Sequence, residues 1–339
     1  MATASVSIAG MTSPQIPAPG FRADATLGDI GEFALIDALT RSFVQGDHVL
    51  LGPGDDAAVV AVPRGRVVVS TDLMVDTRHF RRDWMSAADV GHRAAAQNLS
   101  DINAMGGVAT ALTVGLATPA DLPVAWALEL AEGIAAEAGL VGASVVGGDL
   151  TQADEVMIAV TVLGSVDGEP VRRSGARPGD VVAIAGRQGW AAAGLAVLGR
   201  GFRSPRVLVE AYRRPEPPYA EGARALVAGA TAMIDVSDGL LADVGHIASS
   251  SDVAVDLTTS AFEIAEPFQA VAAALGTDPM SFILSGGDDH ALVATFPSDV
   301  LLPEGWSVIG AVSEPAVGGA GVTVDGASYD GPAGHTHFH

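Results

Sequence analysis

Apolar and polar positions follow two different periods along most of this chain, so strands and helices are expected to alternate. Runs such as VVVSTD, VMIAVTVLGSV and HALVATF predict strands, whereas FALIDALTRSF and LLADVGHIA have helical spacing. A helix is also expected from Ser86 to Gly106, because Ser86 and Asp89 match a capping box. Alternation of this kind in both halves predicts an α/β or α+β fold with mixed sheets.

The length of 339 residues suits two domains, since a domain typically has about 150 residues. A charged, glycine-rich stretch, DGEPVRRSGARPGD, is the best candidate boundary. We therefore expect a disordered leader at 1–26, an N-terminal domain at 27–168 and a C-terminal domain at 169–339. Within the second half, 206–218 is rich in arginine and proline and is expected to be an exposed connection.

The leader has neither the basic start nor the apolar block of a signal peptide, and no apolar run is long enough to cross a bilayer. A cytoplasmic location is therefore expected. The net charge of -22, from 40 acidic and 18 basic residues, disfavours nucleic acid and anionic membranes as partners.

Two residue types are absent from the sequence. Without cysteine the chain has no disulfide, thiolate metal site or thiol nucleophile. Without lysine it has no Walker P-loop, no strand lysine of the protein-kinase type and no Schiff-base chemistry. Any phosphate chemistry must therefore rely on a metal ion, arginine and backbone amides.

Acidic motifs recur after strand-like runs. Each alone is ordinary turn or capping chemistry, and Ser237 or Asp238, for instance, is a good helix N-cap. Two carboxylates ~4 Å apart repel by roughly 4 kcal/mol at an effective dielectric of ~20, so a pocket that gathers several needs a cation. Oxygen ligands favour a hard divalent ion, typically Mg²⁺ shared with substrate phosphates. The motifs are GDD at 54–56, STD at 70–72, NLSD at 98–101, GGD at 147–149, DVSDG at 235–239 and SGGDD at 285–289.

Local spacing suggests how the first of these motifs meet. Strand-like runs at 57–62 and 66–72 predict a hairpin that brings Asp72 close to the GDD motif. Asn98 and Asp101 are three positions apart on the expected helix and should share one face. The GGD motif is expected just after a short strand.

In combination these motifs resemble the thiamine-monophosphate kinase family, whose superfamily includes aminoimidazole ribonucleotide synthetase and selenophosphate synthetase. The resemblance extends from GEFALID at Gly31 to the last residues, through LLGPGDDAAV, STDLMVDTRHF, NLSDINAMGG, VVGGDLT, RRSGARPGD and DVSDGLLADVGHIA. It implies the two-domain architecture of aminoimidazole ribonucleotide synthetase, with a homodimer paired through the N-terminal sheets. It also implies ATP-dependent phosphorylation of thiamine monophosphate to thiamine diphosphate, with release of ADP.

The resemblance further implies roles for individual residues. No general base is expected, because the attacking phosphate oxygen is already ionised at neutral pH and the reaction depends on positioning and charge neutralisation. ATP would contact Gly148, Asp149, Arg173 and Ser237, and the substrate would contact His79, Asp288 and His335. Several Mg²⁺ ions would be held by Asp56, Ser70, Thr71, Asp72, Asp101, Asp149, Asp235 and Asp238.

The chain departs from the family pattern at the substrate end. Asp288 and His290 stand where the family usually has Glu and Tyr, and His335 stands at about the place of an aromatic residue. These departures affect recognition of the substrate rings and leave the metal and ATP motifs unchanged. Two alternatives remain open, namely another ATP-using synthetase of the superfamily and a non-catalytic module that binds Mg-ATP.

Overall fold

The computed structural model describes residues 21–335, except for 23, 31, 54–57, 63–65, 316–318 and the side chains of 32 and 33. Asp56 and most of the expected leader therefore lie outside the described residues. The packed chain begins before Leu27, because Ala25 is buried against Leu35 and Val124.

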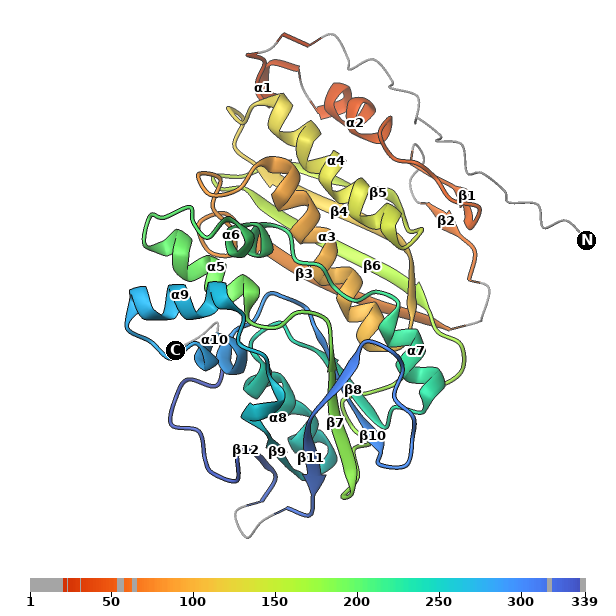
Figure 1. The fold of residues 1–339 in the computed structure, drawn as a ribbon. Helices are drawn as coiled ribbons and strands as arrows, with labels where there is room; N and C mark the ends of the chain where they lie inside the picture. Colours follow the sequence, from red (N-terminus) through yellow and green to blue (C-terminus); the bar gives the residue numbers. More distant parts are fainter. Residues whose placement is uncertain are drawn as a thin grey trace, which may run out of the picture.

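The N-terminal half is built on a sheet with the strand order β3-β6-β4-β5 (Figure 1). β6 runs antiparallel to both β3 and β4, whereas β4 and β5 are parallel. Helices α3 (Ala87–Ala104) and α4 (Val124–Leu140) cover one face of this sheet. The strands are β3 (Val67–Val75), β4 (Val108–Thr118), β5 (Ser144–Gln152) and β6 (Met157–Ser165).

Helix α3 begins where the sequence predicts it. The Ser86 side chain accepts the N–H of Asp89, and the Asp89 side chain accepts the N–H of Ser86, which confirms the capping box. Two glycines bring α3 and α4 close together, because a Cβ on Gly91 would lie 2.1 Å from the carbonyl oxygen of Leu130. Gly133 of α4 has the reciprocal role, since its Cβ would lie 2.2 Å from a carbonyl of α3.

Among the described residues of 57–62 and 66–72, the expected hairpin pairing is absent. β2 (Val59–Val60) pairs instead with β1 (Val49–Leu51), and all nine residues of β3 pair with β6. β3 therefore takes its ladder partner from a distant part of the chain, and the two residues of β2 pair with the strand before them. Two short helices, α1 (Leu27–Ile30) and α2 (Glu32–Thr40), precede β1.

The C-terminal half has a larger sheet with the strand order β12-β9-β11-β7-β10-β8, antiparallel except for the β12–β9 pair. The α/β class with mixed sheets is thus confirmed. The strands are β7 (Asp180–Ala185), β8 (Ala232–Asp235), β9 (Ala254–Leu257), β10 (Leu292–Pro297), β11 (Trp306–Ser313) and β12 (Gly321–Val324). The helices are α5 (Trp190–Gly199), α6 (Arg206–Arg213), α7 (Glu221–Ala228), α8 (Leu240–Ser251), α9 (Glu266–Leu275), α10 (Met280–Ser285) and the 3₁₀ helix η1 (Thr259–Ala261).

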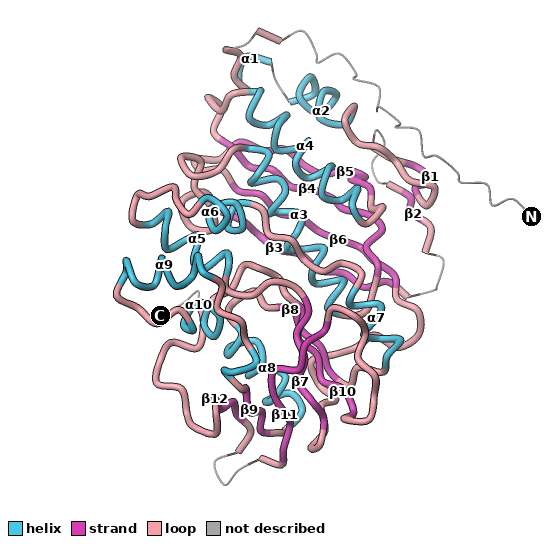
Figure 2. The backbone as a smooth tube through the Cα atoms, viewed as in Figure 1, coloured by secondary structure: helices cyan, strands magenta, loops and turns pink. Residues whose placement is uncertain are grey.

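The stretch 206–218 is not simply an exposed connection, because its first part forms α6. Leu208, Val209 and Tyr212 of α6 are buried, and apolar residues at this spacing stabilise a helix by packing one face. α6 packs on α5 and contacts α3, beside which Figure 2 shows it, so this segment joins the two halves.

Helix α3 lies at the junction of the two halves. It packs on β3 and β6 of its own sheet and also contacts β8 of the other. The main apolar core is continuous across this junction, from Leu99 and Val160 to Ile234. Among the residues that the structure describes, no helix is both long enough and apolar enough to cross a membrane.

Candidate active site

One face of β3 presents two of the expected metal ligands to α3. The Ser70 hydroxyl donates to the carboxylate of Asp101 at 2.6 Å. The backbone N–H of Asp72 donates to the side-chain oxygen of Asn98 at 3.1 Å. Asn98 and Asp101 therefore do share a face of the helix, and that face is the one that meets β3.

The C-terminal half brings a third carboxylate to the same place. Asp235, the last residue of β8, is buried and lies 3.1 Å from Nδ1 of His290. Burial raises the pKa of Asp72, and repulsion from Asp235 raises it further. Burial, Asp235 and Asp72 together raise the pKa of Asp101 to about 7. We call Asp72, Asp101 and Asp235 the carboxylate centre.

The carboxylate centre has the chemistry of a cation site. The described residues contain no group of three or more His, Cys, Asp or Glu side chains already arranged to hold one ion. The three carboxylates are nevertheless close enough to repel one another in a buried setting, and their donors are all oxygens. A hard divalent ion would relieve this repulsion and suits such ligands, so the residues present fit the expected Mg²⁺.

The DVSDG motif is shaped by an aspartate that the sequence analysis did not single out. The carboxylate of Asp243 accepts the backbone N–H groups of Ser237, Asp238 and Gly239, each at 3.0 Å. The expected side-chain cap by Ser237 or Asp238 is absent, and the N-cap residue is Gly239 with φ 141°. A Cβ at Gly239 would lie 2.6 Å from the carbonyl oxygen of Ser285, so glycine is required there. Burial raises the pKa of Asp243 to about 7.

Several expected ATP and substrate residues meet at this motif. The N–H of Asp288 donates to the carbonyl of Ser237 at 3.0 Å, and the N–H of His335 donates to the carbonyl of Asp238 at 2.9 Å. Burial by itself raises the pKa of Asp288. Arg93, His290 and His335 lower this pKa by more than burial raises it, so the net shift is downward. His290, which bonds Asp235 and acts on the charge of Asp288, connects this end of the site to the carboxylate centre.

Two other expected ligands lie on the opposite face of the N-terminal sheet. Successive side chains of a strand point to opposite faces, so Thr71 lies on the face opposite to Ser70 and Asp72. Its hydroxyl lies 2.8 Å from that of Thr161. Asp149 lies inside β5 and is not in a turn after a strand. β5 and β3 are opposite edges of the sheet, about 14 Å apart at the usual strand spacing. One chain therefore does not bring Asp149 together with Asp72.

Gly148 and Asp149 border a large cavity of about 1130 Å³. The cavity is lined by the N-terminal sheet, α2, the β1–β2 hairpin and part of α4, and its lining is mainly apolar. A Cβ at Gly148 would lie 2.0 Å from the carbonyl oxygen of Val114, so only glycine permits β4 and β5 to pair here.

His79 and Arg173 lie at the margins. Nδ1 of His79 accepts the N–H of Val75 at 3.0 Å, which fixes the ring beside the end of β3. The carbonyl of Arg173 accepts the Ser251 hydroxyl at 3.3 Å, at the opposite end of α8 from Ser237. The structure thus places Arg173 apart from the DVSDG motif.

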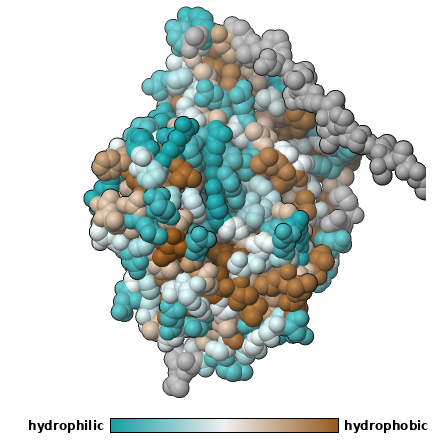
Figure 3. Space-filling model, in the orientation of Figure 1, coloured by the Kyte–Doolittle hydropathy of each residue, from teal (hydrophilic) through white to brown (hydrophobic). Residues whose placement is uncertain are grey.

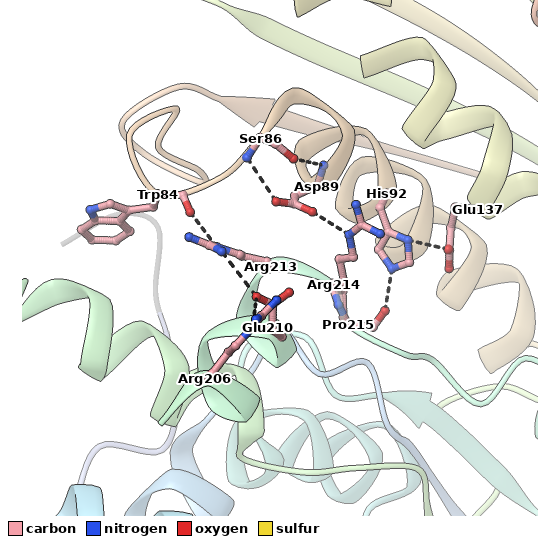
Figure 4. Close-up of polar contacts among 10 residues, drawn as sticks. All are labelled: Trp84, Ser86, Asp89, His92, Glu137, Arg206, Glu210, Arg213, Arg214 and Pro215. Atoms are coloured by element: carbon pink, nitrogen blue, oxygen red, sulfur yellow. Dashed lines mark hydrogen bonds and ion pairs between the residues drawn. The ribbon is translucent and has the colours of Figure 1, made fainter. Parts of the chain in front are cut away.

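On another side of α3, polar contacts join this helix to α4 and to the C-terminal half (Figure 4). Asp89 pairs with Arg214 at 2.6 Å. Nδ1 of His92 lies 2.7 Å from Glu137 and its Nε2 lies 2.9 Å from the carbonyl of Pro215. Figure 3 shows hydrophilic residues gathered over α3 and α6. We call Asp89, His92, Glu137 and Arg214 the inter-domain strip.

Comparison with known proteins places the chain. Residues 54–166 match the family model "AIR synthase related protein, N-terminal domain". The chain is 50% identical over 315 residues to the thiamine-monophosphate kinase of Mycobacterium tuberculosis H37Rv, covering 92% of this chain and 93% of that protein. It is 39% identical to the thiamine-monophosphate kinase of Corynebacterium glutamicum over 299 residues, covering 85% and 88%. The chain belongs to the thiamine-monophosphate kinase family.

Solved structures agree with this assignment. A thiamine-monophosphate kinase from Stenotrophomonas maltophilia matches with a TM-score of 0.76 at 32% identity, covering 88% of this chain and 98% of that one. The complex of AaThiL with AMPPCP and TMP matches with a TM-score of 0.74 at 29% identity, covering 92% and 99%. Escherichia coli HypE, at 18% identity and a TM-score of 0.69 over 90% and 98%, shares the fold. The expected family, its two-domain fold and the expectation of an enzyme are confirmed.

The sequence analysis gave no role to several buried side chains of this thiamine-monophosphate kinase family member. These side chains bond to residues of the acidic motifs or to a nearby helix end. Arg93 and Asp243 are buried and position motif residues from outside the motifs. Asp289 belongs to the SGGDD motif but was given no role, and its carboxylate accepts the N–H of Ala191 in the first turn of α5 at 3.0 and 3.1 Å. No local pattern in the run RAAAQNL indicated that Arg93 is buried, because burial of an arginine depends on the partners that the fold brings to it.

Proposed function

We propose that this chain transfers the terminal phosphoryl group of ATP to the phosphate of thiamine monophosphate, which yields thiamine diphosphate and ADP. The observation that carries the proposal is the carboxylate centre, which adjoins Ser237, Asp288 and His335 at the junction of the two halves. Family membership and the AaThiL complex with AMPPCP, an ATP analogue, and TMP support it.

Different residues of this chain are proposed to bind ATP and the phosphate acceptor. Ser237 is proposed for ATP within one chain, through its hydroxyl. Gly148 and Asp149 are proposed to contact ATP from a second copy, because they lie at the far edge of the sheet from Asp72. Arg173 is retained as a proposed ATP contact, because a guanidinium suits phosphate oxygens. His79, Asp288 and His335 are proposed for the acceptor. The chain needs no base, since an acceptor phosphate oxygen is already ionised.

Several Mg²⁺ ions are proposed as the cofactor. When bound, Mg²⁺ would supply positive charge that offsets the negative charge of the two phosphate-bearing substrates. Asp72, Asp101 and Asp235 would hold it, with Ser70 and Asp238 beside them. Thr71 and Asp149 lie on the other sheet face, so an ion at those residues would be a separate one. Asp56 is retained as a proposed ligand.

A cytoplasmic homodimer is proposed, with domains divided at 168 and 169. The uncovered face of the N-terminal sheet exposes the apolar side chains of Val67, Val69 and Leu73. An apolar face of this kind suits a second copy of the chain, which could also bring an Asp149 toward the other copy's site. Analytical ultracentrifugation tests the dimer, and a monomer at assay concentrations would contradict it.

The decisive experiment incubates the purified protein with Mg-ATP and thiamine monophosphate and separates nucleotides and thiamine species by chromatography. Thiamine diphosphate should appear in step with ADP, and chelation of Mg²⁺ should stop both. Thiamine in place of its monophosphate serves as the control acceptor. Binding of ATP without thiamine diphosphate would overturn the proposal and favour another acceptor or a non-catalytic module.

A further inference from the structure

Arg93 is a buried arginine of α3, and each partner named for it belongs to the C-terminal half. Its guanidinium donates to the carbonyl of Tyr212 at 2.8 Å and lies 4.7 Å from the centre of the Tyr212 ring. It also pairs with the carboxylate of Asp288 at 2.6 Å. Because a guanidinium presents its donors in a rigid plane, these contacts together fix its orientation.

Asp288 meets Arg93 from the turn between α10 and β10. The side chain of Arg93 is 5% exposed, whereas that of Asp288 is 41% exposed. One oxygen of Asp288 is therefore held by Arg93 while part of the carboxylate stays accessible. The backbone of Asp288 has φ 68°, a left-handed conformation that a residue with a Cβ adopts at a cost in free energy. Its N–H bond to Ser237 and its pairing with Arg93 offset that cost.

The position of Arg93 on α3 relates this turn to the carboxylate centre. Arg93 and Asp101 are eight residues apart, which is about 12 Å along a helix. His290 lies between the two regions, since it bonds Asp235 and follows Asp288 by two residues. An acceptor with a phosphate at one end and an organic ring at the other could extend from the carboxylate centre past His290 to Asp288.

We propose that Arg93 is a positioning residue that holds Asp288 in one orientation, so that the accessible part of its carboxylate binds the organic end of the phosphate acceptor. This inference rests on the proposed function. The acceptor group would be a hydrogen-bond donor or a cation, because an ionised carboxylate can only accept. Helix α3 then sets the separation between the phosphate end and the ring end of the site.

The competing explanation is that Asp288 merely neutralises a buried arginine. The two explanations differ in what the loss of Arg93 does to each substrate. A structural pair would affect both substrates alike, whereas a positioning residue would weaken binding of the acceptor alone.

The test measures KM for thiamine monophosphate and for ATP, together with kcat, in Arg93→Met and Arg93→Lys. Arg214→Met is the matched control, because Arg214 also joins the C-terminal half to α3 but pairs with Asp89. Arg93→Met should raise KM for the acceptor about tenfold or more and leave KM for ATP near the wild-type value. The acceptor KM of Arg93→Lys should lie between those of the wild type and Arg93→Met, since lysine keeps the charge and loses the planar fork. Arg214→Met should change neither KM.

A double variant, Arg93→Met with Asp288→Asn, asks whether Arg93 acts through Asp288. Its acceptor KM should rise no more than in the single variants, because contacting residues are not additive. Equal increases in both KM values, or additive losses in the double variant, would overturn the proposal. If Arg93→Met does not fold, Arg93→Lys and Asp288→Asn still test the proposal, because KM for the acceptor and KM for ATP can be compared in both. A wild type that forms no thiamine diphosphate overturns the proposed function together with this inference.

Discussion

Helix α3 contributes charged side chains to two regions of the molecule. In one region they face groups of like charge, and in the other they pair with groups of opposite charge. Toward β3 and β8 it contributes Asp101 to the carboxylate centre, where burial and like charges raise the pKa of Asp101 to about 7. Toward α4 and α6 it carries Asp89 and His92, each of which meets a partner of opposite charge. Both regions join the two halves of the molecule.

The difference separates binding from architecture. Carboxylates that repel one another in a buried place destabilise the fold unless a ligand compensates them, so their presence marks a site. Charges that are already paired hold elements together and leave nothing for a ligand to neutralise. The comparison predicts opposite results for the same chemical change, carboxylate to amide, in the two regions.

The largest effect is expected for Asp101→Asn. Phosphoryl transfer should fall by about 10²-fold to 10³-fold, because a ligand of the proposed ions loses its charge. The melting temperature of the metal-free protein should not fall, because the amide removes a buried negative charge facing Asp72 and Asp235. Coupled ADP release and calorimetry measure the two effects. Asp299→Asn, in an exposed turn after β10, is the control, and normal activity with a lower melting temperature in Asp101→Asn would break the comparison.

A smaller effect of opposite kind is expected for Glu137→Gln in the inter-domain strip. The Tyr219 hydroxyl and His92 both bond to this buried carboxylate. The free energy of unfolding should fall by about 1.5 to 3 kcal/mol, because both partners lose an ionised acceptor. Activity of the folded enzyme should be unchanged. Urea unfolding followed by circular dichroism provides the measurement, and a loss of transfer without a loss of stability would contradict this view of the strip.

The smallest effect is the pH dependence of the strip. Burial by itself lowers the pKa of His92 and Arg214 lowers it further, but Glu137 and the carbonyl of Pro215 outweigh both, so the pKa lies above its ordinary value of 6.5. A raised pKa in the folded state gives stabilisation that is complete below 6.5 and is lost as the pH rises through the folded-state value.

His92→Gln tests this sign. The stability advantage of the wild type over His92→Gln should shrink as the pH rises from about 5 to about 9. Denaturant unfolding at several pH values measures it, and an advantage that grows with pH would refute the assignment.

The sequence anticipated features that depend on neighbouring residues. The capping box of Ser86 and Asp89 formed where it was predicted, and so did the shared face of Asn98 and Asp101. The predicted hairpin into β3 was wrong because β2 pairs with β1, and β3 takes its partner from the distant β6, which no local spacing indicates. The predicted N-cap at Ser237 or Asp238 was wrong, because Asp243 in the first turn of α8 accepts the N–H groups of this loop itself.

The sequence by itself determined the family, the fold class and the residue types of the site, because motifs, capping and periodicity are local. Only the tertiary structure decided which of these residues meet. It joined Asp72 and Asp101 to Asp235 through the packing of α3 on β8, and it separated Asp149 by the width of the sheet. It also paired Arg93 with Asp288 across 195 positions of chain, as the residue numbers show. Such contacts depend on the register of strands and the docking of two halves, and no short stretch of sequence encodes either.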